Sequence, residues 1–383
     1  MQTFLKLSKI KTSYIFLSLI IFLLLSTKAI YAQDEGKRKS ELPFNTDATI
    51  NLFRSLNIPA YQVAYYKGDN IVFQLSNGFR NQDTKQAINH NTAFQAASLT
   101  KVVATYVFLR LMDRGLISLD KPLWEYYPYD RLINHPNKDK ITARMVLTHR
   151  TGLLNWEGDV PTEEWRETPL TQQFIPGTDY RYSGEGFYFL QETMEHITKK
   201  SFQELVEQEV LIPFEMKDSE IVWKDRLEQN AAFGHFKDMK PRKLGKYLKS
   251  NAAYTLYTTA KDYTNFLEKV IFEGKGLKAE THKLFLEKAG EVKKDKNTSA
   301  DDQHVPIALG LRMQINEVGT SYWHTGSNPG FRCYFVAYPK TKEILTVFTN
   351  SENGFSSMPG ILALFLNNNQ TFWLYTWRQG ELD

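Results

Sequence analysis

The stretch Phe94-Gln-Ala-Ala-Ser98-Leu-Thr-Lys101 places a serine three residues before a lysine, at the start of an apolar helical pattern. Residues at i and i+3 share one face of a helix. If Ser98 lies in the first helical turn, the amine of Lys101 is therefore close enough to take up or steer the hydroxyl proton. The spacing predicts an activated nucleophile. The alternative is that both residues only cap and solvate the end of a helix.

The S-x-x-K pattern is short, and two other copies of it stand in different surroundings. Residues 8–11 lie in a segment that resembles an export leader, and residues 118–121 run directly into a proline, which marks a helix boundary. Only Ser98 opens a long apolar stretch, residues 102–114, which is followed by a glycine of the kind that ends helices. Such an apolar helix is normally buried, so a serine and a lysine at its head indicate a functional site.

The first 32 residues have the order of a signal peptide: lysines, then the apolar run 14–25, then Ala29-Ile-Tyr-Ala32 before a polar stretch. We therefore predict export of the chain, to the periplasm or to the outside of the cell. A retained N-terminal anchor is the alternative, because Ile30 is less favourable than a small residue near the cleavage site. After cleavage we expect no membrane span.

The composition bounds the partners and the cofactors. The four lysines of the leader account for the whole formal excess of +4, so the mature chain has no net basic charge that would indicate nucleic acid or an anionic membrane as its partner. Cys333 is the only cysteine and cannot form a disulfide within the chain. The sequence has no H-E-x-x-H or paired-cysteine motif, and no phosphate loop or dinucleotide fingerprint. We predict neither a metal nor a cofactor.

The strand patterns fall into two groups at opposite ends of the chain. Residues 61–66 and 70–75 read as a hairpin. Four further strand patterns come late, at residues 307–315, 321–324, 331–338 and 343–349. Between the groups lies a long stretch that reads as mostly helical. The pattern predicts an α+β fold in which one antiparallel sheet is flanked by helices, with the middle of the chain inserted as a helical lobe. Clefts between such lobes are favoured places for a site.

The expected organisation follows from these patterns. We predict a flexible segment at residues 33–47, one domain at residues 48–365 and a C-terminal tail at residues 366–383. Within the domain, an α/β lobe takes residues 48–125 and 250–365, and the helical lobe takes residues 126–249. Residues 223–250 are rich in lysine and arginine. They read as a solvated surface excursion, with a lid or a contact to an anionic polymer as the alternative.

Two further segments supply groups that a reactive serine needs. Tyr182 follows the turn Pro176-Gly177 and precedes a helix, so its ring can project into a cleft; near a cation such as Lys101, its phenol would lose a proton more easily and act as a base. An ordinary packed tyrosine is the alternative. His324 follows a predicted strand and is either a site residue or a structural histidine.

The segment after His324 is a candidate for binding the reacting carbonyl. Gly326 lets the backbone come close to a ligand. The amide of Ser327, on an edge strand, can pair with the amide of Ser98 to form an oxyanion hole.

Taken in order, Ser98-x-x-Lys101, Tyr182-Ser-Gly184 and His324-Thr325-Gly326 resemble the three motifs S-x-x-K, Y-x-N and K/H-T-G of the serine β-lactamase and penicillin-binding-protein superfamily. The flanking segments 141–153, 174–182 and 254–262 are similar to that superfamily as well, and the resemblance extends from about Ala48 to Phe365.

The resemblance is closest to the class C-type branch, which includes β-lactamases, D-alanyl-D-alanine carboxypeptidases, D-aminopeptidases and esterases. It implies a β-lactamase/transpeptidase-like fold and acylation of Ser98, with the proton work shared by Lys101 and Tyr182. It further implies an oxyanion hole made by the Ser98 and Ser327 amides, and substrate contacts at Thr325, Gly326 and Gly184. Fold alone does not choose the substrate.

Two departures from the β-lactamase pattern bear on the substrate. Gly184 stands where the second motif usually has asparagine, so the side-chain amide that would bind the acyl amide of a penicillin or peptide is absent, at a cost of about 1–3 kcal/mol. His324 replaces the more common lysine and attracts a substrate carboxylate less strongly. We therefore predict an esterase or a D-amino-acid peptidase or carboxypeptidase acting on a small ester or D-Ala-type peptide, cell-wall fragments included. The alternatives are a β-lactamase, or a penicillin-binding sensor with slow deacylation; a non-catalytic scaffold is the third.

Overall fold

The computed structural model describes residues 46–292, 300–366 and 369–382. The predicted leader and almost all of the predicted flexible segment 33–47 lie outside the described residues; Thr46 and Asp47 begin helix α2 (Thr46–Ser55). None of the described helices is both long enough and apolar enough to cross a bilayer.

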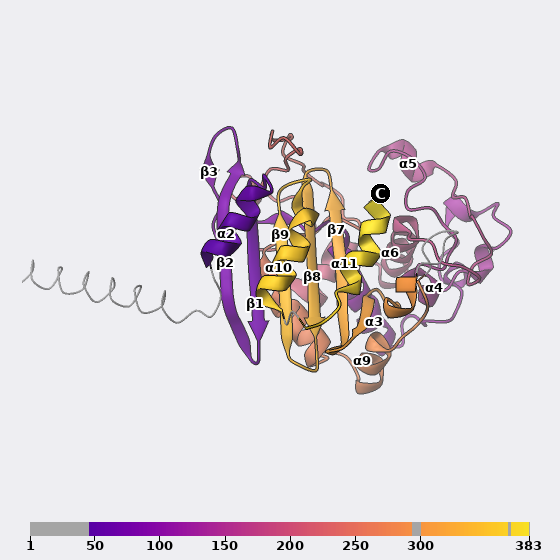
Figure 1. Cartoon of the computed structure of the whole chain (residues 1–383). Coiled ribbons are helices and arrows are strands. Elements are labelled where there is room, and N and C mark those ends of the chain that lie inside the picture. The colour runs from indigo at the N-terminus through magenta and orange to yellow at the C-terminus, as the bar shows by residue number, and fades with distance from the viewer. Residues whose placement is uncertain (1–45, 293–299, 367–368, 383) are drawn as a thin grey trace, which may run out of the picture. The chain divides into compact units, whose positions relative to one another are not determined.

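A seven-stranded sheet forms the centre of the domain, in the order β3-β2-β1-β9-β8-β7-β6, with every neighbouring pair antiparallel (Figure 1). Its strands are β1 (Ala60–Lys67), β2 (Asn70–Asn81), β3 (Gln86–Ala87), β6 (Arg312–Asn316), β7 (Gly319–Asn328), β8 (Phe331–Tyr338) and β9 (Glu343–Thr349). Because β1 pairs with β9, the N-terminal hairpin and the late strands share one sheet. The predicted α+β architecture is confirmed.

The first late strand begins five residues later than predicted, at Arg312 instead of Ile307. Gly310 has a φ of +64°, a conformation that favours glycine. A Cβ at this position would lie 1.9 Å from Oγ1 of Thr105. The chain therefore turns tightly against helix α3 (Thr100–Asp113) before it enters the sheet.

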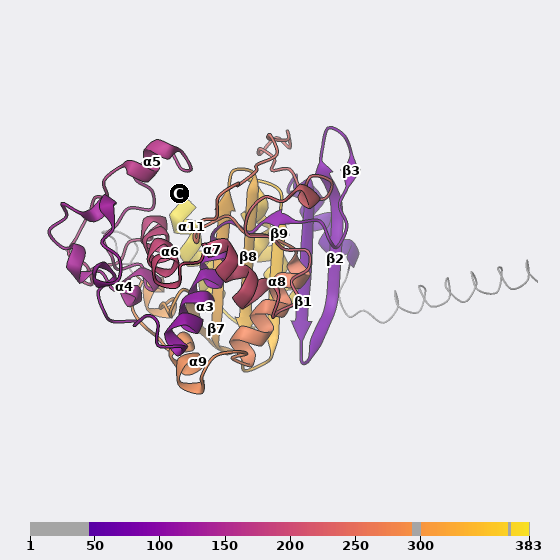
Figure 2. The ribbon, with the colours of Figure 1, turned by 180° about the vertical axis from the view of Figure 1, so that it is seen from behind.

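Helices cover both faces of the sheet. Figure 1 shows α2, α10 (Met358–Phe365) and α11 (Trp373–Leu382) on one face, and Figure 2 shows α3 and α8 (Ala260–Leu267) on the other. On the first face the ring of Phe365 packs 5.6 Å from that of Tyr65 of β1. On the second, Tyr263 of α8 packs edge-on against Phe348 of β9.

The C-terminal segment, which we expected to form a tail, packs against the sheet. The amide of Leu374 donates to Oε1 of Gln314 at 2.9 Å, and Nε1 of Trp377 donates to Oδ1 of Asp302 at 2.8 Å. The Trp377 ring also meets that of Trp323 on β7, with 6.2 Å between centroids. Helix α11 therefore buries large apolar side chains against the domain.

The inserted lobe contains less helix than the sequence predicts. Its helices are α4 (Ala143–Leu147), α5 (Glu163–Glu167), α6 (Gly184–Thr198) and α7 (Phe202–Val206). Between residues 126 and 249, all of which are described, α6 is the longest helix, and α7 continues directly into a π-helix at Glu207–Leu211. Loops connect these helices, and the following segment contributes β5 (Tyr257–Thr258), which pairs with β4 (Phe94–Gln95), and α9 (Ala279–Leu286).

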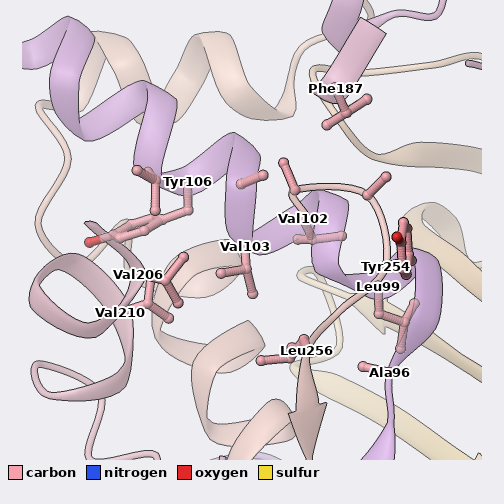
Figure 3. Packing of buried hydrophobic residues seen from close by; sticks show 14 of the residues in the cluster. Ala96, Leu99, Val102, Val103, Tyr106, Phe187, Val206, Val210, Tyr254 and Leu256 are labelled. Atoms are coloured by element: carbon pink, nitrogen blue, oxygen red, sulfur yellow. The ribbon is translucent and has the colours of Figure 1, made fainter. Parts of the chain in front are cut away.

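Helix α3 runs through the core between the sheet and the inserted lobe. Its residues Val102, Val103 and Tyr106 are buried, and Figure 3 shows them packed near Val206 and Leu256. The helix ends as predicted: the glycine at 115 has a φ of +74°, which closes the last turn. The residues at the start of α3 are therefore attached to the buried core of the domain.

The basic segment 223–250 lies on the surface, and six of its eight basic residues pair with acidic residues of the same chain. The pairs are Lys224–Glu207, Arg226–Glu220, Lys240–Asp238, Arg242–Glu352, Lys246–Glu228 and Lys249–Glu163. A cavity of about 540 Å³ is lined by part of this segment together with Gln95 and Pro329. The internal pairing favours the interpretation as a solvated surface excursion.

Candidate active site

Ser98 is the one residue between Thr92 and Leu109 that is not buried. It lies in a single 3₁₀ turn (Ala97–Leu99) that leads directly into α3. Ala97 has a φ of +49°, a left-handed conformation that costs energy in a residue with a Cβ. This strained turn presents the hydroxyl of Ser98 to solvent at the end of a buried helix.

Close packing at Gly326 of β7 holds the Ser98 turn in place. A Cβ at Gly326 would lie 2.4 Å from the carbonyl oxygen of Ala96 and 2.5 Å from Sγ of Cys333. The thiol of Cys333 also donates to the Ala96 carbonyl, with 2.9 Å between the atoms. From the sequence we expected Gly326 to let a ligand come close to the backbone. In the structure it is the carbonyl oxygen of Ala96 that lies close to Gly326. Strand β7 and the Ser98 turn are thereby fixed against each other.

Lys101 lies one turn beyond Ser98 and is 1% exposed. Its Nζ is 3.3 Å from Oγ of Ser98 and donates to the carbonyl of Ala253 at 3.0 Å. Burial disfavours the charged ammonium and lowers the pKa of Lys101 to about 7. Among the described residues, no carboxylate forms an ion pair with this lysine. Its amine can therefore release and accept a proton near neutral pH.

Tyr182 lies beside Lys101, as the sequence predicts. Nζ of Lys101 is 4.9 Å from the centroid of the Tyr182 ring, and Cζ of Arg312 is 5.8 Å from it. The residue is partly exposed and directly precedes Ser183, whose side chain caps the N-terminus of α6. The Tyr182 ring therefore borders the amine that contacts Ser98.

His149 is a neighbour of Tyr182 whose role the sequence did not reveal. Its ring lies 4.3 Å from the ring of Tyr182. The amide of Ser183 donates to Nδ1 of His149 at 3.2 Å, and the amide of Arg181 donates to its carbonyl at 2.8 Å. His149 therefore holds the backbone on both sides of Tyr182. The only signal for it was its place within the segment 141–153.

His149 is also kept neutral. Burial lowers its pKa well below the usual value, and the charges of Lys101, Arg312 and His324 lower it further. A neutral imidazole whose Nδ1 accepts a hydrogen bond carries its proton on Nε2. The residue is therefore a fixed acceptor for the Tyr182 loop and adds no positive charge to the site.

His324 is another neighbour of Tyr182, with 6.3 Å between the ring centroids. It is buried, and its Nδ1 lies 2.7 Å from the carbonyl of Thr325. A carbonyl oxygen only accepts, so Nδ1 carries a proton in this contact. The structure thus brings Ser98, Lys101, Tyr182 and His324 to one place.

Strand β7 has an open edge at the site. Its pairing with β6 ends at Trp323, opposite Arg312, whereas its pairing with β8 continues to Asn328. In an antiparallel pair, alternate residues direct their backbone groups toward the partner strand. Asn328 closes a two-residue turn opposite Phe331, which places it in a hydrogen-bonded pair. Ser327 consequently directs its amide away from β8, to the side where no described strand pairs.

Gly184 is the first residue of α6, and its amide donates to Oδ1 of Asn155 at 2.9 Å. A Cβ at Gly184 would lie 2.5 Å from the indole ring of Trp156. The place that an asparagine side chain would take is therefore filled by a tryptophan from another loop. Trp156 is a further residue that the sequence analysis did not single out.

A buried ion pair anchors the loop that carries Trp156. Nη1 of Arg131 lies 2.8 Å from Oε2 of Glu185, and both side chains are almost completely buried. Oε1 of Glu185 also accepts hydrogen bonds from the amide of Glu157 at 3.0 Å and from Nε1 of Trp165 at 2.6 Å. The start of α6 and the loop 155–168 are thus tied together.

The model of the Beta-lactamase family matches residues 46–364 of the chain. Among solved structures, the fold is similar to a class C beta-lactamase (TM-score 0.72, 19% identity, 88% of this chain and 98% of that one). It is also similar to a penicillin-binding protein from Bacillus halodurans (TM-score 0.70, 22% identity, 82% of this chain and 98% of that one).

Curated relatives match over shorter stretches. Protein flp of Staphylococcus aureus (strain MW2) is 20% identical over 189 residues, which cover 47% of this chain and 38% of that protein. An uncharacterized protein of Alkalihalophilus pseudofirmus is 32% identical over 123 residues, 32% of each chain. The matches thus span less than two fifths of the length of these relatives.

Proposed function

Because the chain belongs to the Beta-lactamase family, with the fold of its serine hydrolases, we propose that it hydrolyses a small ester or D-amino-acid peptide through an acyl-enzyme on Ser98. The observation that carries this proposal is the contact between Lys101 and Ser98, in which an amine with a pKa near 7 lies 3.3 Å from the only accessible hydroxyl of a buried turn. A lysine that serves only to cap a helix has no reason to be buried without a carboxylate partner.

In the first step, the neutral amine of Lys101 or the phenolate of Tyr182 takes the proton of Ser98. The Ser98 oxygen bonds to the substrate carbonyl carbon, and the amides of Ser98 and Ser327 stabilise the oxyanion. The bond to the leaving alcohol or amine then breaks, and the leaving group receives the proton that the base took up. Water repeats the sequence on the acyl-enzyme, releases the acid and restores the serine.

Two features support an ester or a small D-amino-acid substrate over a β-lactam. The indole of Trp156 fills the space above Gly184, so the second motif offers no side-chain amide to an acylamino group. His324 donates its Nδ1 proton to a neighbouring carbonyl, which leaves fewer donors for a substrate carboxylate than the lysine of the β-lactamase pattern would have.

The competing candidate is a β-lactamase, or a penicillin-binding protein that deacylates slowly. The similar solved structures favour it, since they are those of a penicillin-binding protein and a class C beta-lactamase. Mass spectrometry after exposure to penicillin separates the candidates. A persistent adduct on Ser98 indicates a sensor, rapid recovery with loss of the lactam indicates a β-lactamase, and absence of acylation leaves the esterase or peptidase.

A p-nitrophenyl acyl ester tests the proposed function. We expect a burst of p-nitrophenol followed by steady turnover, and we expect Ser98→Ala to abolish both. Ser118→Ala is the matched control, because Ser118 belongs to an exposed copy of the same S-x-x-K pattern. Equal turnover by the wild type and Ser98→Ala would refute the proposal. A parallel screen of D-Ala-D-Ala peptides, D-amino-acid amides and nitrocefin then identifies the acyl donor.

Export of the chain remains part of the proposal, supported by the order of charged, apolar and small residues in its first 32 positions. Sequencing the N-terminus of protein produced in a bacterial host tests it. A mature chain that begins at Gln33 in the periplasm or medium is expected. An uncleaved chain at the membrane would instead indicate the anchor.

A further inference from the structure

We infer that Trp156, held in place by its packing against the buried ring of Tyr254, selects the acyl group of the substrate and favours esters of aromatic or bulky apolar carboxylic acids. The inference rests on the proposed hydrolysis through Ser98 and extends it to the substrate class. It is drawn from the placement of two aromatic side chains between Lys101, Gly184 and the end of β7.

Tyr254 borders the site through its backbone. The residue before it, Ala253, accepts the hydrogen bond of Lys101, and the carbonyl of Tyr254 accepts one from Nδ2 of Asn328 at 3.3 Å. Asn328 in turn directly follows Ser327, the second oxyanion donor. Tyr254 is thus attached on one side to the lysine and on the other to β7, and Figure 3 shows its ring beside Leu99 and Ala96.

Trp156 extends this aromatic surface toward α6. Its ring meets that of Tyr254 edge-on, with centroids 5.4 Å apart and an angle of 89° between the planes. Behind it, Trp165 packs at 5.8 Å and donates to the buried carboxylate of Glu185. Trp156 itself is only partly buried. The exposed part of the indole is therefore held in place by fixed neighbours and remains available to a ligand.

The position of Trp156 also excludes a polar side chain that could bind an acylamino group. An indole atom lies 2.5 Å from the position of a Cβ on Gly184, so a side chain at residue 184 and the indole compete for one space. An acyl group that reaches the indole of Trp156 meets ring carbons. An acylamino group at the same place would lose its hydrogen bonds to water without replacement. Aromatic and branched apolar acyl groups gain contact area and ring packing at the same place.

The experiment compares two esters that differ only in the acyl group, p-nitrophenyl acetate and p-nitrophenyl phenylacetate. We expect the wild type to prefer the phenylacetate. Trp156→Ala should lower kcat/KM for the phenylacetate by about tenfold and change that for the acetate by less than about twofold, since the apolar contact is made only by the larger group. Trp156→Phe, which keeps a ring, should retain most of the preference.

Trp124→Ala is the matched control, since Trp124 is a partly buried tryptophan just before the inserted lobe, and its ring contacts Lys138. Labelling of Ser98 by a fluorophosphonate reports whether each variant keeps a folded site. Equal losses for both esters in Trp156→Ala, or an unchanged preference with intact labelling, would overturn the inference and leave the proposed function standing. Wild-type protein that neither labels at Ser98 nor turns over either ester would instead overturn the proposed function.

Discussion

The amine of Lys101 is hydrogen-bonded to the carbonyl of Ala253 and to the hydroxyl of Ser98, two groups that carry no charge. Nothing in this pair of contacts compensates the charge of an ammonium in a buried position. Both the neutral and the charged form of Lys101 are therefore populated near neutral pH.

The rate of ester hydrolysis should rise with pH through the pKa of Lys101. The lysine acts as a base only when neutral, and burial lowers its pKa to about 7. We expect kcat/KM to be about tenfold lower at pH 6 than on the plateau above pH 8. Lys101→Arg, which stays charged, should be inactive over the whole range. A flat profile for the wild type would exclude the lysine as the titrating base.

The same shift predicts a pH-dependent contribution to stability. The pKa of Lys101 is lower in the folded chain, about 7, than its ordinary value of 10.5, so between these values the unfolded chain binds more protons. The free energy of unfolding should therefore rise with pH in this window, by about 1.4 kcal/mol per pH unit from this group. Urea unfolding of wild type and Lys101→Met at pH 7, 8 and 9 measures it. Parallel stability curves for the two proteins would contradict the prediction.

His149 should act as a positioning residue for Tyr182. Its Nδ1 and carbonyl hold the amides of Ser183 and Arg181, and misplacing a reacting group by about 1 Å can cost a hundredfold in rate. We expect His149→Ala to lower kcat by about ten- to a hundredfold with little change in KM. His149→Gln keeps an acceptor and should recover part of the loss.

His196→Ala is the control for that experiment, because His196 stacks on Tyr127 in the inserted lobe and contacts none of the site residues. If both histidine variants lose activity equally, or if His149→Ala raises KM alone, the assigned role is wrong.

Gly326→Ala should disturb the nucleophile without touching it. The added methyl group would lie 2.4 Å from the Ala96 carbonyl, so β7 and the Ser98 turn must move apart. We expect a loss of about 1–3 kcal/mol in stability and a fall of at least about tenfold in kcat. Gly158→Ala, at a glycine with open space around it, should change neither. Wild-type activity of Gly326→Ala would show that the contact between strand and turn has no catalytic consequence.

The strands and the helix that are marked by runs of apolar residues could be predicted from the sequence. Short runs of apolar and aromatic residues at 61–66 and 331–338 identified β1 and β8, and the apolar run 102–114 identified α3 together with the position of Ser98 at its head. The motifs also brought Lys101, Tyr182 and His324 into the same predicted site. Helix α11 was missed because most of its apolar residues fall within positions 373–377 and a polar stretch with a glycine follows, so no helical period is apparent.

The missed site residues depend on contacts between loops. Trp156 stands in a loop without periodicity, and its place over Gly184 follows from the ion pair between Arg131 and Glu185, which are 54 positions apart. His149 is one histidine among eight, and its hydrogen bond to Ser183 connects two segments that carry no signal of proximity. Such pairings are decided by packing in three dimensions, which no local pattern records.

The anchoring of the loop 155–168 by Glu185 separates two tasks within one domain. The reactive turn is held between α3 and β7, whereas Trp156 belongs to a loop that is attached through hydrogen bonds to Glu185. Substitutions in this loop can therefore change which acyl groups bind, while Ser98 and Lys101 keep their positions. Related proteins with this arrangement can change their substrate specificity by exchanging a single loop.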